Sequence, residues 1–103
     1  MNAPPFPPEL ILYNSPKACS LAPHIVLEES GLPYATRSVN IRAGEHLRPE
    51  YLKLNPNGKI PVLVDGDLVL YETAAIVLHL VDTHPQAGLA PALGTAERAH
   101  FYK

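Results

Sequence analysis

The sequence contains a single cysteine, Cys19, among 103 residues. A lone cysteine excludes an intrachain disulfide and a Cys-x-x-Cys dithiol centre, and it fits a reducing compartment such as the cytoplasm. The 8 basic and 10 acidic residues form no run of one sign, which argues against a nucleic-acid groove. The apolar runs fall well short of the roughly 20 residues that span a bilayer. We therefore expect a soluble, cytoplasmic protein with neither a membrane nor a nucleic-acid partner.

Metal-ligand spacing is missing as well. The five histidines include no His-x-x-x-His pair, and one cysteine cannot complete a thiolate site. We expect no metal, and we expect His24, His79 and His84 to be surface or packing residues.

Short apolar segments between turn signals predict a small mixed fold. The expected strands are 9–13, 34–40, 61–64 and 68–71, and the expected helices are 20–30 and 72–83. Residues 42–54 are polar and at most weakly helical. A strand, helix and strand in succession imply parallel pairing, whereas the acidic turn at 65–67 predicts an antiparallel hairpin. The fold class is α/β (α+β), a thioredoxin-like βαβ-ββα arrangement with a mixed four-stranded sheet.

The ends of the chain differ from this central unit. Residues 1–8 form a Pro-rich arm without the basic and apolar regions of a signal peptide. Residues 9–84 form the thioredoxin-like domain, and residues 85–94 form a linker rich in Pro, Gly and Ala. Thr95 is a suitable helix cap, so residues 95–103 are expected to begin a further helix that is too short to persist alone.

Three segments together resemble the N-terminal domain of a cytosolic glutathione transferase. They are SPKACSLAPHI (15–25), NPNGKIPVL (55–63) and LYETAAI (70–76), and they follow one another in the order and spacing of that family. The first segment is most similar to the bacterial beta class. Family members continue into an all-helical second domain, so the resemblance implies that residues 95–103 are its truncated start.

The resemblance implies a set of glutathione-binding residues. The family keeps the bond before Pro61 cis, which turns the Ile60 backbone toward the cysteinyl unit of glutathione, whereas a trans proline starting a strand is the plain alternative. Glu72 and Thr73 would hold the γ-glutamyl head at a helix N-terminus, although Thr73 could instead be an ordinary N-cap. Lys59 stands where relatives often carry glutamine. Arg42 would pair with the glycyl carboxylate.

Cys19 and Ser20 are the candidate catalytic residues. A thiol at a helix N-terminus has a lowered pKa, and the resemblance implies that the sulfur of glutathione lies beside Cys19. The alternative is that Cys19 packs as a small apolar residue. Ser20 is the competing activator of the glutathione thiol, and it could equally be an N-cap.

The implied function is transfer of glutathione to a small electrophile, with glutathione as co-substrate and no other cofactor. The implied partner is a second copy, since the family expectation for the full-length protein is a homodimer. Two alternatives remain: a glutathione-dependent thiol-disulfide or isomerase reaction through Cys19, and a non-catalytic interaction module. We expect these 103 residues alone to have little conjugating activity.

Overall fold

The structure, a computed structural model, describes residues 10–15 and 21–103. In chain order, the elements are β1 (Leu10–Asn14), α1 (Leu21–Ser30), β2 (Tyr34–Ser38), the 3-10 helix η1 (Glu45–Leu47), α2 (Pro49–Leu52), β3 (Val62–Asp65), β4 (Leu68–Tyr71), α3 (Thr73–Thr83), the 3-10 helix η2 (Pro85–Ala87) and α4 (Ala96–Phe101). The predicted order of strands and helices is confirmed. The predicted linker is less irregular than expected, because its first residues form η2.

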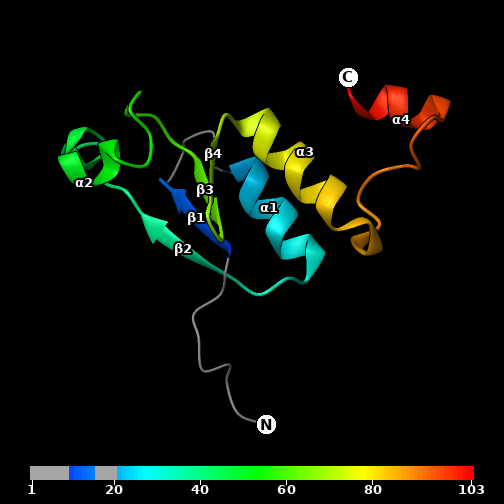
Figure 1. Cartoon of the computed structure of the whole chain (residues 1–103), viewed down its shortest axis with the longest axis horizontal. Coiled ribbons are helices and arrows are strands. Elements are labelled where there is room, and N and C mark those ends of the chain that lie inside the picture. The colour runs from blue at the N-terminus through cyan, green and yellow to red at the C-terminus, as the bar shows by residue number, and fades with distance from the viewer. Residues whose placement is uncertain (1–9, 16–20) are drawn as a thin grey trace, which may run out of the picture.

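The four strands form one mixed sheet in the order β2-β1-β3-β4 (Figure 1). β1 and β2 are parallel, with Leu10 opposite Tyr34, as the strand-helix-strand pattern predicts. β3 is antiparallel to β1 and to β4. Asp65 lies opposite Leu68 across the hairpin, and Gly66 takes a φ of 60° in the turn between them. The mixed four-stranded sheet is thus confirmed.

Alternating side chains bury both faces of the sheet. Leu12 and Leu63 point to the face covered by α1 and α3, where they pack with Leu27 and Ile76 in the main core. Val62, next to Leu63, points to the opposite face. There a second cluster forms around Val62, Val39 and Tyr51 of α2, with further half-buried side chains packed on it (Tyr13, Leu54, Ile60, Val64 and Tyr71).

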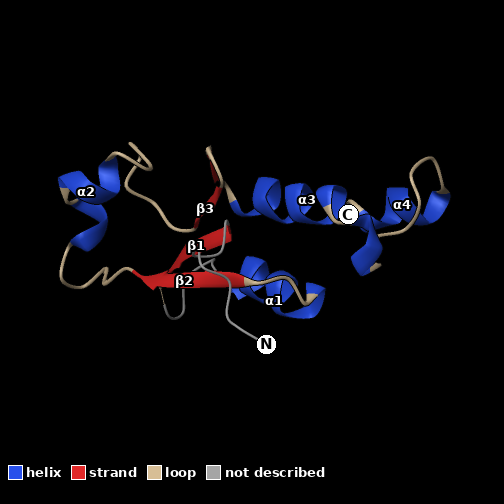
Figure 2. Cartoon of the chain, turned by 60° about the horizontal axis from the view of Figure 1, so that its bottom comes forward, coloured by secondary structure: helices blue, strands red, loops and turns tan. Residues whose placement is uncertain are grey.

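The helices therefore lie in two layers on either side of the sheet. α1 and α3 pack side by side, and α2 with η1 sits at the other end of the molecule (Figure 2). This arrangement brings the loop after α2 and the start of α3 to the same edge of the sheet. In the described ranges 10–15 and 21–103, no helix is both long and apolar enough to cross a membrane.

The final helix, α4, is anchored by one arginine. Thr95 caps it as predicted, since its Oγ1 accepts from the Arg98 N–H at 3.1 Å. The Arg98 side chain is only 7% exposed. It donates to the Asp82 carboxylate on α3, to the Pro91 carbonyl at 2.8 Å and to the Tyr102 hydroxyl at 3.1 Å. A helix this short is not expected to persist alone, and Arg98 ties α4 to α3 and to residue 91.

Candidate functional site

The turn at residues 55–58 sets one wall of the site. Asn55 closes it, because its carbonyl accepts from the Gly58 N–H at 2.9 Å and its Oδ1 accepts from the Asn57 N–H at 3.0 Å. Gly58 has a φ of 64°, and a Cβ there would meet the His46 carbonyl oxygen at 3.2 Å. Only glycine fits this close approach without strain. The turn thereby packs against η1 and directs Lys59 and Ile60 toward the sheet edge.

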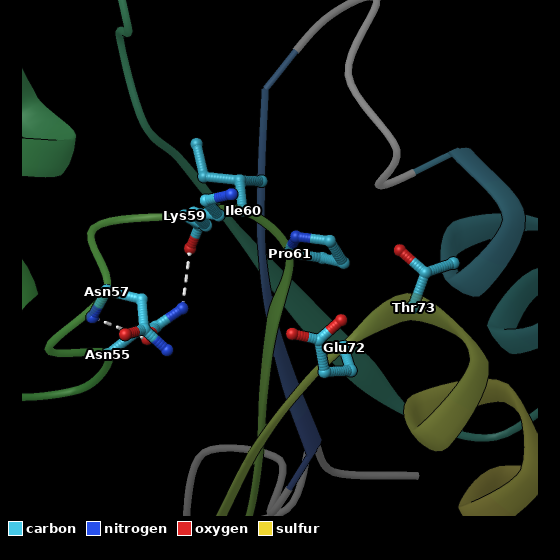
Figure 3. A pocket seen from close by; sticks show the side chains of 7 residues that line it. All are labelled: Asn55, Asn57, Lys59, Ile60, Pro61, Glu72 and Thr73. Carbon is cyan, nitrogen blue, oxygen red and sulfur yellow. Dashed lines mark hydrogen bonds between the residues drawn. The ribbon is translucent and has the colours of Figure 1, made fainter.

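Two buried side chains hold the carbonyl of Lys59. The Tyr51 hydroxyl donates to it at 2.5 Å. The Asn55 Nδ2 donates to it at 3.0 Å (Figure 3). Tyr51 is 5% exposed and Asn55 is 2% exposed. The next peptide bond, between Ile60 and Pro61, is cis. The backbone that faces the pocket is therefore fixed by two buried side chains, Tyr51 from outside the pocket and Asn55 from its lining.

Glu72 and Thr73 form the opposite wall. Glu72 occupies the N-cap position of α3 with φ 81° and ψ 118°, and its carbonyl accepts the first helical hydrogen bond from Ile76 at 3.0 Å. Thr73 is the first residue inside the helix. The alternative that Thr73 is the N-cap is therefore wrong. A residue other than glycine at positive φ is strained, and such strain concentrates at functional sites.

These two walls enclose a pocket of about 180 Å³. It is lined by Asn55, Asn57, Lys59, Ile60, Pro61, Glu72 and Thr73 (Figure 3). The lining combines the Lys59 ammonium, the Glu72 carboxylate, the Thr73 hydroxyl and the first backbone N–H groups of α3. Such N–H groups and the helix dipole favour an anion. The pocket therefore suits a ligand that carries carboxylates and an ammonium group.

The predicted residues Lys59, Ile60, Pro61, Glu72 and Thr73 thus come together from the two ends of the β3–β4 hairpin. Arg42 does not join them, because it lies in the exposed turn before η1 and does not line the pocket. The two candidate catalytic residues, Cys19 and Ser20, lie outside the described residues.

Sequence reasoning missed Asn55, Asn57 and Tyr51. The two asparagines stand within the resembling segment 55–63 but were not predicted as binding residues, and they also line the pocket. Tyr51 gave no signal beyond its place in a polar, weakly helical segment. Tyr51 also lines a second cleft of about 320 Å³, and its ring packs edge-to-face with Tyr13 at a centroid distance of 6.1 Å.

The histidines occupy several environments. His24 packs edge-to-face on Tyr34, which agrees with a packing role. His79 makes a polar contact as well, because its Nε2 lies 2.8 Å from the Asp65 carboxylate. This contact links α3 to the hairpin. The buried Nδ1 of His46 has no hydrogen-bond partner within the described part of the chain. Within that same part, no group of three or more metal-ligating side chains gathers.

Comparison with known proteins identifies the class. Residues 8–82 match the family model for the N-terminal domain of glutathione S-transferases, and the chain belongs to this family. It is 42% identical over 81 residues to glutathione S-transferase 1 of Dianthus caryophyllus, covering 78% of this chain and 37% of that protein. It is 46% identical over 78 residues to glutathione S-transferase GST-4.5 of Xanthomonas campestris, covering 76% of this chain and 37% of that protein.

Solved structures agree with the sequence relatives. A glutathione transferase homologue from Sulfitobacter, crystallised with bound glutathione, is 37% identical and superposes with a TM-score of 0.80. The match covers 90% of this chain and 47% of that one. The thioredoxin-like N-terminal fold of the family is thereby established. The chain spans less than half the length of the relatives that it matches.

Proposed function

We propose that the protein binds glutathione in the pocket between residues 59–61 and 72–73, as part of a glutathione transferase. The observation that carries this proposal is the pairing of an extended backbone segment with a helix N-terminus that bears an acid and a hydroxyl, Glu72 and Thr73. Glutathione carries a zwitterionic γ-glutamyl head at one end and a carboxylate at the other. It is also the molecule bound in the related Sulfitobacter structure.

Each part of the pocket has a role in this proposal. The N–H groups at the start of α3 and the Thr73 hydroxyl receive the γ-glutamyl carboxylate, and the Glu72 carboxylate attracts its ammonium group. The Ile60 backbone pairs with the cysteinyl unit in the manner of strand addition. Lys59, which is exposed at the rim, attracts the glycyl carboxylate. We no longer include Arg42 in this set, because it does not line the pocket.

The bound thiol would react as a thiolate with an electrophile. Cys19 and Ser20 are proposed as its activators on the strength of the sequence resemblance alone. The thiol proton passes to solvent, and the thiolate attacks the electrophilic carbon. In a substitution the leaving group departs with the electron pair of its bond, and in an addition to an activated double bond the resulting carbanion takes up a proton from solvent. The electrophile, the beta-class assignment, a homodimeric assembly and a cytoplasmic location stay predictions for the whole protein.

A γ-linked head is the feature that tests the proposal. Calorimetry should detect binding of glutathione and much weaker binding of the α-linked tripeptide Glu-Cys-Gly, which has the same composition but a different head. Thr73→Ala should weaken glutathione binding by about 1.5–3 kcal/mol, the range for a hydrogen bond to a charged group, and Thr73→Ser should be nearly silent. Equal affinity of the protein for the two tripeptides would contradict the proposed head contacts.

Glutathione binding separates the proposed function from the non-catalytic alternative, and turnover assays are needed for the thiol-disulfide or isomerase alternative. A non-catalytic interaction module need not bind glutathione at all. A thiol-disulfide or isomerase enzyme would bind it and would also depend on Cys19, so Cys19→Ala would abolish turnover while leaving affinity intact. No binding of glutathione by the protein would refute the proposed function.

A further inference from the structure

We propose that Tyr51 is a positioning residue for the glutathione pocket: its hydroxyl fixes the Lys59 carbonyl and so presets the backbone that faces the ligand. This inference rests on the proposed function. Tyr51 does not line the pocket and would touch no ligand. It acts from behind the pocket wall, through the peptide group that Lys59 shares with Ile60.

Lys59 is the residue through which Tyr51 would act on the pocket. Its carbonyl is held by two donors, Tyr51 at 2.5 Å and Asn55 at 3.0 Å. A carbonyl oxygen has two lone pairs, so these donors use its full capacity. Because the peptide unit is planar, fixing this oxygen also fixes the direction of the Ile60 N–H. The orientation of the ligand-facing backbone is thereby coupled to the Tyr51 hydroxyl.

Tyr51 is itself held in a fixed position by its neighbours. Its own carbonyl accepts from the N–H groups of Leu54 and Asn55, at 2.9 Å and 3.0 Å. Its ring is 5% exposed and packs against Tyr13. Burial, with a smaller contribution from Tyr13, raises the pKa of the Tyr51 hydroxyl to about 12. The phenol therefore stays protonated and able to donate well above neutral pH, and its position is set by its buried surroundings.

Asn55 belongs to the same unit. It donates to Lys59 and accepts from Asn57, and its backbone N–H bonds to Tyr51. Asn55 therefore shapes the turn itself, and its replacement would disturb the lining directly. The Tyr51 hydroxyl bonds only to Lys59 among the described residues, so its removal leaves the turn intact. Tyr51 is therefore the better residue at which to test whether this hydroxyl controls the ligand-facing backbone.

The experiment compares Tyr51→Phe with Tyr13→Phe in the full chain. Both variants remove one hydroxyl from the same ring pair, but only Tyr51 donates to Lys59. Glutathione affinity is measured by calorimetry well below the melting temperature of each variant, and thermal stability is measured separately. We expect Tyr51→Phe to raise the Kd for glutathione by about three- to tenfold, the range set by one net hydrogen bond, and Tyr13→Phe to leave it unchanged. The carbonyl ¹³C resonance of Lys59 should shift only in Tyr51→Phe.

A second variant keeps the test decisive if Tyr51→Phe does not fold. Replacing Tyr51 with 3,5-difluorotyrosine retains the hydroxyl and makes it more acidic. Glutathione affinity should match the wild type at low pH and fall as this phenol ionises, because a phenolate cannot donate to Lys59. The wild-type protein, over the same pH range, provides the baseline.

The outcomes separate the two proposals. If the wild type does not bind glutathione, the proposed function fails. If the wild type binds and Tyr51→Phe lowers only the melting temperature, with an unchanged Kd, Tyr51 is merely structural and the inference is overturned. The same conclusion follows if Tyr13→Phe weakens binding equally, or if the fluorinated variant follows the wild-type pH profile.

Discussion

The strained backbone at Glu72 gives the sharpest quantitative prediction. Glu72 has φ 81° and ψ 118°, a region that side chains with a Cβ rarely adopt. Such a conformation costs roughly 1–3 kcal/mol. Glycine removes this strain. It also gives the unfolded chain more conformational freedom, which lowers the free energy of unfolding by roughly 0.4–1 kcal/mol. Comparing Glu72→Gly with Glu72→Ala isolates the strain, because both lose the carboxylate and only alanine keeps the Cβ. We expect the glycine variant to be more stable than the alanine variant by about 1 kcal/mol.

Thermal unfolding measures this difference directly. For a domain of 60–100 residues, about 1 kcal/mol corresponds to roughly 4–8 °C in Tm. Both variants should bind glutathione about two- to fivefold more weakly than the wild type, because Glu72 is exposed and exposed charge pairs contribute at most about 1 kcal/mol. Glu72→Gly would then be stabilised relative to Glu72→Ala without recovering affinity. If Glu72→Ala is as stable as Glu72→Gly or more stable, the backbone at residue 72 carries no strain and the reasoning is refuted.

Two further predictions concern the rest of the chain. Arg98→Met should release α4 from α3, which would be seen as faster amide hydrogen exchange in residues 96–101 with little change at β1. Arg98→Lys should fail to restore protection, because a lysine lacks the planar guanidinium that reaches Asp82, Pro91 and Tyr102 together. Unchanged exchange in both variants would show that α4 is held by other contacts. Cys19 should be alkylated with an apparent pKa below the usual value of about 8.5 and should form a mixed disulfide with oxidised glutathione, whereas Cys19→Ala should form no adduct. A thiol that resists alkylation in the folded protein would favour the packing interpretation.

The fold was predictable because its signals are local. The pattern of residues 61–71, two apolar runs around an acidic turn with glycine, predicted the hairpin. β4 has the expected bounds, and β3 is shifted by one residue toward the C-terminus. Pro23 limited where the first helix could begin, and the structure has it in the first turn of α1. The least periodic segment, residues 42–54, gave the weakest expectation. There the structure has η1 and α2, and the placement of α2 depends on the packing of Tyr51 onto Val62 and Val39.

Five residues of the pocket lining were predictable, whereas Asn55, Asn57 and the supporting Tyr51 were not. Lys59, Ile60, Pro61, Glu72 and Thr73 fall in segments that a family resemblance can locate, because they are the groups that would face a ligand. The position of Arg42 relative to these residues could not be predicted, because the turn that carries it does not pair in register with the sheet. Tyr51 gave no signal because its contribution depends on a single hydrogen bond across eight residues, to a backbone atom that has no side-chain identity in the sequence. A sequence specifies side chains, whereas this wall of the pocket is formed by the peptide group between Lys59 and Ile60. The residues that hold a peptide group in place are visible only once the chain has folded around it.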